Sequence, residues 1–113
     1  MRLSPLKSQT KTRAKNIVDL LRSMGFKVST PREGDLCLES YLECCGQVLR
    51  LVFFDGRYTD DLVIKVTPEV GGCEDALYAP KGLYIIGGSD NEVAEKIVQK
   101  AKFLSATLKR TSS

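Results

Sequence analysis

The stretch DLCLESYLECCGQVLRLVFF, residues Asp35 to Phe54, decides the fold because its alternation predicts a β-hairpin together with its register. A two-residue turn at Cys45 and Gly46 sets that register, and the pairs follow by counting outward from it. On one face the pairs are Cys44 with Gln47, Leu42 with Leu49, Ser40 with Leu51, and Leu38 with Phe53. On the other they are Glu43 with Val48, Tyr41 with Arg50, Glu39 with Val52, and Cys37 with Phe54. The first face is nearly all apolar, and a one-residue shift would destroy that segregation.

The next segment, FFDGRYTDDLVIKV from Phe53 to Val66, predicts a further strand. A tight turn at Asp55-Gly56 would place Asp60 on the apolar face, where a lone buried carboxylate is costly. We therefore expect a longer connection and a strand that starts near Leu62. Its core-facing side chains are Leu62, Ile64 and Val66. Lys65 is predicted to face outward from the opposite side.

An amphipathic helix is predicted on the N-terminal side of these strands, from about Thr10 to Met24. Apolar side chains recur there at three- and four-residue spacing, which indicates a helix with one buried face. They are Ala14, Ile17, Val18, Leu21 and Met24. Thr10 or Thr12 is expected to cap its start, and Gly25 followed by Phe26 is typical of a Schellman-type end.

A strand and a second helix are predicted near the C-terminal end, in LYIIGGSDNEVAEK and the residues that follow. Leu83 to Ile86 form the strand, and the helix runs from about Asp90 to Leu108. Its apolar side chains share one face: Val93, Ile97, Ala101, Leu104 and Leu108. Ser89 and Glu92 fit the S-x-x-E capping box, which places carboxylate charge where a phosphate would otherwise bind. We therefore interpret the two glycines as a tight reversal into the helix.

Together these elements predict an α+β fold, a two-layer sandwich with the N- and C-terminal helices packed on one face of a mainly antiparallel sheet. FKVST at 26–30 adds a short strand before the turn-like PREGD, so the sheet has four to five strands and the order is α-β-β-β-β-β-α or α-β-β-β-β-α. A single domain is expected for 113 residues. It spans 10–110, between a flexible basic arm at 1–9 and a disordered tail at 111–113. The loop at 67–82 is long enough for a recognition role.

Composition narrows the possible functions. Hydrophobic residues make up 42% of the chain and charged residues 27%, as in ordinary folded proteins. No apolar run is long enough to cross a bilayer, and the N-terminus lacks the apolar core of a secretory signal, so we predict a cytoplasmic protein. Histidine is absent, which removes the commonest general base and the usual Ser-His and Cys-His pairs. We predict no catalytic residue and no cofactor.

The four cysteines are Cys37, Cys44, Cys45 and Cys73. In a chain without an export signal, buried free thiols are the default expectation. Structural zinc sites use paired cysteines two to four residues apart, often with histidine, and this spacing does not occur here. We predict no metal site.

Charge is strongly segregated along the chain, although the net charge is only +3. Residues 1–32 carry eight bases and one acid, which gives +7. Residues 33–95 carry four bases and thirteen acids, which gives −9, and residues 96–113 carry five bases and no acid, which gives +5. The N- and C-terminal segments are therefore basic, whereas the sheet and its loops are acidic.

If both helices lie on one face of the sheet, their outward sides form a basic surface of the kind that contacts phosphates. We therefore predict a small non-enzymatic protein that binds nucleic acid through this surface. The candidate contacts are Lys7, Lys11, Arg13, Lys15, Arg22, Lys96, Lys100, Lys102, Lys109 and Arg110. The chain shows no recognised signature that separates DNA from RNA. The alternative is a protein-interaction or homodimeric assembly module that binds no nucleic acid.

A divalent-metal nuclease is the third possibility. Its candidate residues are Asp35, Glu39, Asp55, Asp60, Asp61 and Lys65, since such enzymes hold Mg²⁺ with carboxylates and often place a lysine beside the attacking water. The pattern LLRSMGFKV, followed by Gly34 and Asp35, resembles the first helix and strand of archaeal Holliday-junction resolvases. That family carries an acidic-x-Lys triplet on the next strand, which here reads VLRLVFF. Val63 stands where an acid would precede Lys65, so we treat Asp35 and Lys65 as surface residues.

Overall fold

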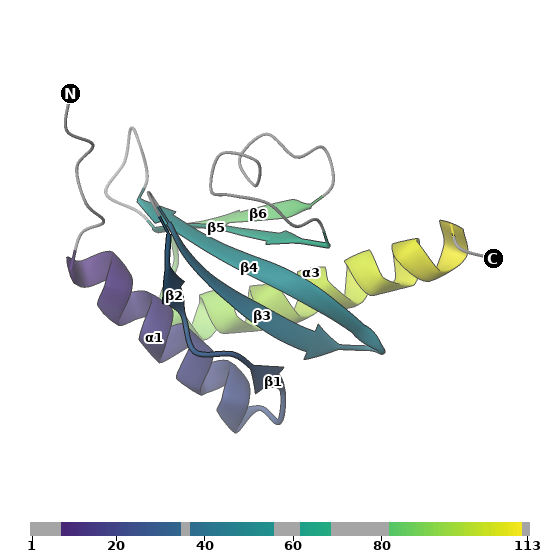
Figure 1. Cartoon of the computed structure of the whole chain (residues 1–113), viewed down its shortest axis with the longest axis horizontal. Coiled ribbons are helices and arrows are strands. Elements are labelled where there is room, and N and C mark those ends of the chain that lie inside the picture. Colours follow the sequence, from purple (N-terminus) through teal and green to yellow (C-terminus); the bar gives the residue numbers. More distant parts are fainter. Residues whose placement is uncertain (1–7, 35–36, 56–61, 69–81, 112–113) are drawn as a thin grey trace.

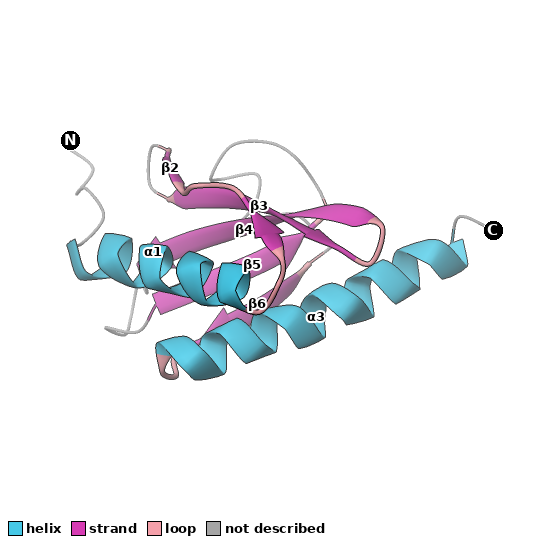
Figure 2. Cartoon of the chain, turned by 90° about the horizontal axis from the view of Figure 1, so that it is seen from below, coloured by secondary structure: helices cyan, strands magenta, loops and turns pink. Residues whose placement is uncertain are grey.

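The computed structural model describes residues 8–34, 37–55, 62–68 and 82–111, with the backbone alone for 107–111. The described chain forms two layers, an antiparallel six-stranded sheet and two helices on one of its faces (Figure 1 and Figure 2). In chain order the elements are α1 Ser8–Ser23, β1 Lys27–Val28, β2 Arg32–Glu33, β3 Leu38–Cys44, β4 Gln47–Asp55, β5 Leu62–Thr67, β6 Leu83–Ile86 and α3 Asp90–Thr111. The predicted α+β sandwich, with a helix at each end of the order, is confirmed.

The hairpin of β3 and β4 has the predicted register. The structure pairs Cys44 with Gln47 at the turn, and the pairing continues without a shift to Leu38 and Phe53. Cys45 and Gly46 form the turn with φ values of 60° and 80°, the left-handed conformation that a two-residue type I′ turn requires. The alternation of apolar and polar residues was therefore sufficient to place the two central strands.

The remaining strands extend this hairpin on both sides, in the order β1-β3-β4-β5-β6, with β2 also paired to β3. β5 begins at Leu62, opposite Asp55, as predicted, while Asp60 lies outside the described residues. The segment after α1 differs from the prediction. Its strand is limited to β1, and the turn-like stretch contains β2, because β3 is long enough for both short strands to pair along one edge.

α1 begins at Ser8, two residues before the predicted start. Thr10 therefore lies within the first turn and does not cap the helix. Its side chain is buried, and its hydroxyl donates a hydrogen bond to the carboxylate of Asp55 at the end of β4. A residue that was predicted as a cap thus connects the helix layer to the sheet.

The end of α1 has the predicted Schellman geometry. The Phe26 N–H donates to the Leu21 carbonyl at 3.2 Å, and the Gly25 N–H donates to the Arg22 carbonyl at 3.0 Å. Gly25 has a φ of 96°, which favours glycine at this position. The chain leaves the helix here and enters β1.

α3 starts as predicted, immediately after the reversal at Gly87 and Gly88, whose φ values are 74° and 96°. The Glu92 N–H donates to the Ser89 hydroxyl at 3.2 Å, so Ser89 is the N-cap. At 1.5 Å per residue, the 22 residues of α3 span about 33 Å. The last turns of α3 extend beyond the tip of the β3–β4 hairpin in both views (Figure 1 and Figure 2).

The core lies between the helices and the sheet. Its largest fully buried apolar side chains come from both layers: Ile17, Val18, Leu21, Leu42, Leu49, Leu51, Phe53, Ile64, Val66 and Ile97. Each was predicted to face the core from the helix or strand periodicity. The sandwich leaves the outward sides of α1 and α3 in contact with solvent.

Part of the opposite face of the sheet is also buried, which corrects one prediction. Lys65 lies on that face, but it is not a surface residue, since only 1% of it is exposed. Its amino group lies 5.1 Å from the centre of the Tyr84 ring, a cation–π contact on the neighbouring strand. Arg50 is also buried there, with its Nη2 2.5 Å from Oε2 of Glu39.

The cysteines differ from the expectation of free buried thiols. Cys37 is disulfide-bonded and packs with Val52 and Phe54 in a small cluster on the face of Lys65. Cys44 is a buried thiol and Cys45 is an exposed one in the hairpin turn, while Cys73 lies outside the described residues. Disulfide pairing depends on which segments meet in space, and the cysteine spacing carried no signal of that meeting.

Candidate nucleic-acid interface

Seven of the ten predicted basic contacts have described side chains. Lys7 lies outside the described residues, and Lys109 and Arg110 lie on α3 with side chains outside them. The other seven divide between the two helices: Lys11, Arg13, Lys15 and Arg22 on α1, and Lys96, Lys100 and Lys102 on α3. The hydrogen bonds and ion pairs of each cation decide whether its charge is available to an external ligand.

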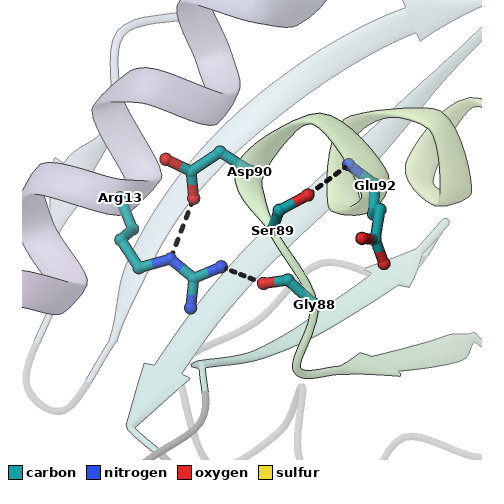
Figure 3. A network of polar contacts seen from close by, with 5 residues as sticks. All are labelled: Arg13, Gly88, Ser89, Asp90 and Glu92. Carbon is teal, nitrogen blue, oxygen red and sulfur yellow. Dashed lines mark hydrogen bonds and ion pairs between the residues drawn. The ribbon is translucent and has the colours of Figure 1, made fainter.

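Arg13 is committed to a contact between the helices (Figure 3). Its Nε lies 2.8 Å from Oδ1 of Asp90, and its Nη2 donates to the carbonyl of Gly88 at 2.6 Å. The side chain is 20% exposed. The guanidinium therefore fixes the first turn of α3 against α1, and its charge is balanced by Asp90.

Arg22 is committed to local structure at the other end of α1. Its Nε donates to the Val28 carbonyl at 3.0 Å, and its Nη2 lies 3.3 Å from the Thr30 hydroxyl. Its Nη1 is also 3.6 Å from Oδ1 of Asp19, one turn earlier in the helix. These contacts hold the segment after the Schellman turn against the helix.

Lys11 forms an ion pair with Glu33 of β2, with Nζ 2.8 Å from Oε1. Both side chains are well exposed, at 41% and 57%, so the pair is weak and exchangeable. Lys15, one turn further on, is exposed and has no ion-pair partner among the described residues.

Three of these α1 cations, Lys11, Lys15 and Arg22, line a shallow groove of about 430 Å³, which we call the α1 groove. It is lined by Lys11, Lys15, Val18, Asp19, Arg22, Thr30, Pro31 and Leu38. The helical period places Lys11, Lys15 and Arg22 on one flank of α1 and Arg13 on the opposite flank. No described α3 residue lines this groove, so the α1 and α3 cations form two separate groups there.

The α3 cations have a different environment. Lys96 and Lys102 are exposed, Lys100 is half-buried, and none of the three has an ion-pair partner among the described residues. The last acid before them is Glu95, and the sequence from residue 96 onward contains none. We call the outward surface of Lys96, Lys100 and Lys102 the α3 basic face.

The nuclease alternative finds little support in the described residues. Glu39 is paired with Arg50, Asp55 accepts a hydrogen bond from Thr10, and Lys65 is buried. Asp35, Asp60 and Asp61 lie outside the described part. Within that part, no group of three or more possible metal ligands converges.

No helix in the described ranges is long and apolar enough to span a membrane. Comparison of the chain with family models, with curated proteins and with solved structures finds no match. We therefore infer the function from the arrangement of these side chains.

Sequence reasoning did not find the roles of Arg13 and Asp90. The two residues are 77 positions apart, and each fits a local role, as an outward helix charge and as a first-turn acid. The residue type is the one feature of the sequence that could have indicated which cations make contacts within the chain. The two α1 cations with several contacts are arginines, whose fork of donors suits such anchoring, whereas the α3 basic face contains lysines.

Proposed function

We propose that the protein is a small non-enzymatic binding protein that holds the phosphate backbone of nucleic acid mainly through the α3 basic face. The α1 groove contributes a weaker, secondary contact through Lys15 and Lys11. The observation that carries this proposal is that the three described lysines of α3 take part in none of the ion pairs of the described structure. On α1, three of the four described cations are instead paired with Asp90, Glu33 and Asp19.

We expect phosphate to bind more favourably at α3 because a cation that is already paired with a carboxylate must first give up that ion pair. A phosphate that approaches α3 meets solvated lysines and releases its condensed counterions, which supplies the driving force for binding. At the α1 groove it must compete with carboxylates already paired to Lys11 and Arg22. The net gain per cation is therefore smaller on α1 than on α3.

A titration of a labelled oligonucleotide over a salt series tests this proposal. The wild-type chain is expected to bind at low salt, with an affinity that falls steeply as salt rises. The triple substitution Lys96→Ala, Lys100→Ala, Lys102→Ala should lower the slope of log K against log salt by about 2 to 3, since each phosphate contact contributes roughly 0.7 to 0.9.

The matched control is the triple substitution of the same lysines to arginine, which keeps the charge and should keep most of the salt slope. No binding by the wild-type chain at low salt would rule out the proposal. Binding without a salt dependence would rule out the phosphate-backbone mechanism.

A protein-interaction or homodimer function is a second candidate, with its own observation. β6 is the last strand in the order of the described sheet, and Ile86 on it is 60% exposed. An apolar, uncharged strand at a sheet edge favours pairing with another strand. Light scattering after size-exclusion chromatography tests this, and Ile86→Lys should convert a dimer to a monomer.

A further inference from the structure

Phe103 is an aromatic side chain in an unusual position. It is 62% exposed, the highest value among the exposed large apolar side chains in the described structure. It lies on α3, two residues before Ser105, whose hydroxyl is 3.5 Å from the Cys44 carbonyl at the end of β3. Large apolar side chains exposed to this degree are informative when they coincide with other unusual features of a surface.

Helical spacing places the lysines of the α3 basic face on both sides of Phe103. Lys100 precedes it by three residues, which places the two side chains next to each other on the helix surface. Lys96 lies two turns earlier on the same side, and Lys102 lies on the other flank of the exposed arc. An exposed aromatic ring is thus bordered by cations on both sides.

We infer that the α3 basic face binds single-stranded nucleic acid, with an unpaired base stacked on the Phe103 ring. This inference rests on the proposed function and specifies its ligand. Proteins that bind single strands combine cations for the backbone with aromatic rings for the bases, since every base presents a π-face. In a duplex the bases are already stacked on each other, so the ring would gain little from duplex backbone contacts.

The charge around the ring selects this occupant over a protein segment. An anionic polymer satisfies the ring and the lysines together, because its bases and phosphates alternate along the strand. An apolar protein surface would cover Phe103 but would have to desolvate Lys100 beside it. The experiment must therefore distinguish a single-stranded nucleic acid from a protein partner.

The first test compares Phe103→Ala with the wild-type chain on a labelled oligothymidylate and on a duplex. We expect the substitution to weaken single-strand binding about 5- to 100-fold, the range that a lost base–aromatic stack produces. Its salt slope should stay unchanged, because no phosphate contact is removed. Duplex binding should change less than about twofold, because the duplex phosphate contacts remain. The substituted residue is exposed, so folding, checked by circular dichroism, should be preserved.

The second test is spectroscopic and uses the fact that the chain contains no tryptophan. Phe103→Trp introduces a single indole at the proposed stacking position. Its fluorescence should be quenched in a saturable manner by the oligothymidylate, with binding retained. Met24→Trp is the control, since Met24 is 47% exposed at the end of α1, outside the α3 basic face, and its fluorescence should not respond.

The outcomes separate the inference from the proposed function. If the wild-type chain binds neither single strand nor duplex, the proposed function fails and the inference fails with it. If it binds with a salt slope while Phe103→Ala binds normally and Phe103→Trp is not quenched, the inference alone is overturned. An equal loss of single-strand and duplex binding in Phe103→Ala would also overturn it.

Discussion

The two helices carry similar positive charge in the sequence but use it differently in the structure. On α1, Arg13 and Arg22 make several contacts within the chain, and Lys11 is paired across to β2. On α3, no described lysine has an ion-pair partner in the described structure. The comparison shows that a count of basic residues measures the charge of a segment, whereas the fold decides how much of that charge an external ligand can use.

The difference follows from where each helix lies relative to the acidic parts of the chain. α1 packs beside β1, and its flanks reach the acids of β2 and of the first turn of α3. α3 has its three acids in its first two turns, and Asp90 and Glu92 in the first turn complement the helix dipole, while Glu95 directly precedes Lys96. The rest of α3 then extends away from the acidic segments toward the far end of the sheet.

The largest expected effect is a loss of folding stability when Arg13, a cation that contacts other parts of the chain, is removed. Arg13→Ala removes two charge-assisted hydrogen bonds and leaves Asp90 and the Gly88 carbonyl without this donor. We expect the free energy of unfolding, measured with urea, to fall by about 2 kcal/mol, while the salt slope of binding stays unchanged. Arg13→Lys is the control and should recover little stability, because an amine cannot reproduce the fork. Normal stability with weakened binding would place Arg13 among the ligand contacts instead.

Removing the carboxylates of the α1 groove should make it bind nucleic acid more tightly. If carboxylates limit it, the double substitution Asp19→Asn, Glu33→Gln should release Lys11 and Arg22 and tighten oligonucleotide binding about 3- to 10-fold, with a steeper salt slope. Glu43→Gln, on an exposed position of β3, changes the net charge by one unit against two for the double substitution, so the two gains in log K are compared per unit of charge. An equal gain per unit of charge in the control would show that long-range charge alone sets the affinity.

The smallest expected effect concerns the Lys11–Glu33 pair. Because both side chains are well exposed, Lys11→Ala should change the free energy of unfolding by less than about 0.5 kcal/mol. Chemical denaturation of this variant beside Arg13→Ala measures the contrast between an exposed ion pair and a part-buried one. A loss as large as that of Arg13→Ala would mean that the groove is a structural element.

Much of the fold was predictable because the decisive signals are local. The hairpin register follows from alternation around Cys45-Gly46, and the ends of the helices follow from Gly25 and from Ser89. The site was predictable only as a set of charges. The partner of Arg13, the burial of Lys65 and the disulfide of Cys37 depend on segments distant in sequence, and no local pattern encodes them.

The most direct test of binding through the α3 basic face compares two matched lysine pairs, each spaced by one helical turn. Lys11→Ala, Lys15→Ala removes the pair on α1, and Lys96→Ala, Lys100→Ala removes the pair on α3. With a labelled oligothymidylate over a salt series, we expect the α3 variant to lose about 1.4 in salt slope and the α1 variant less than about 0.7. Equal losses, or a larger loss from the α1 variant, would contradict the claim that the α3 basic face is the principal binding surface.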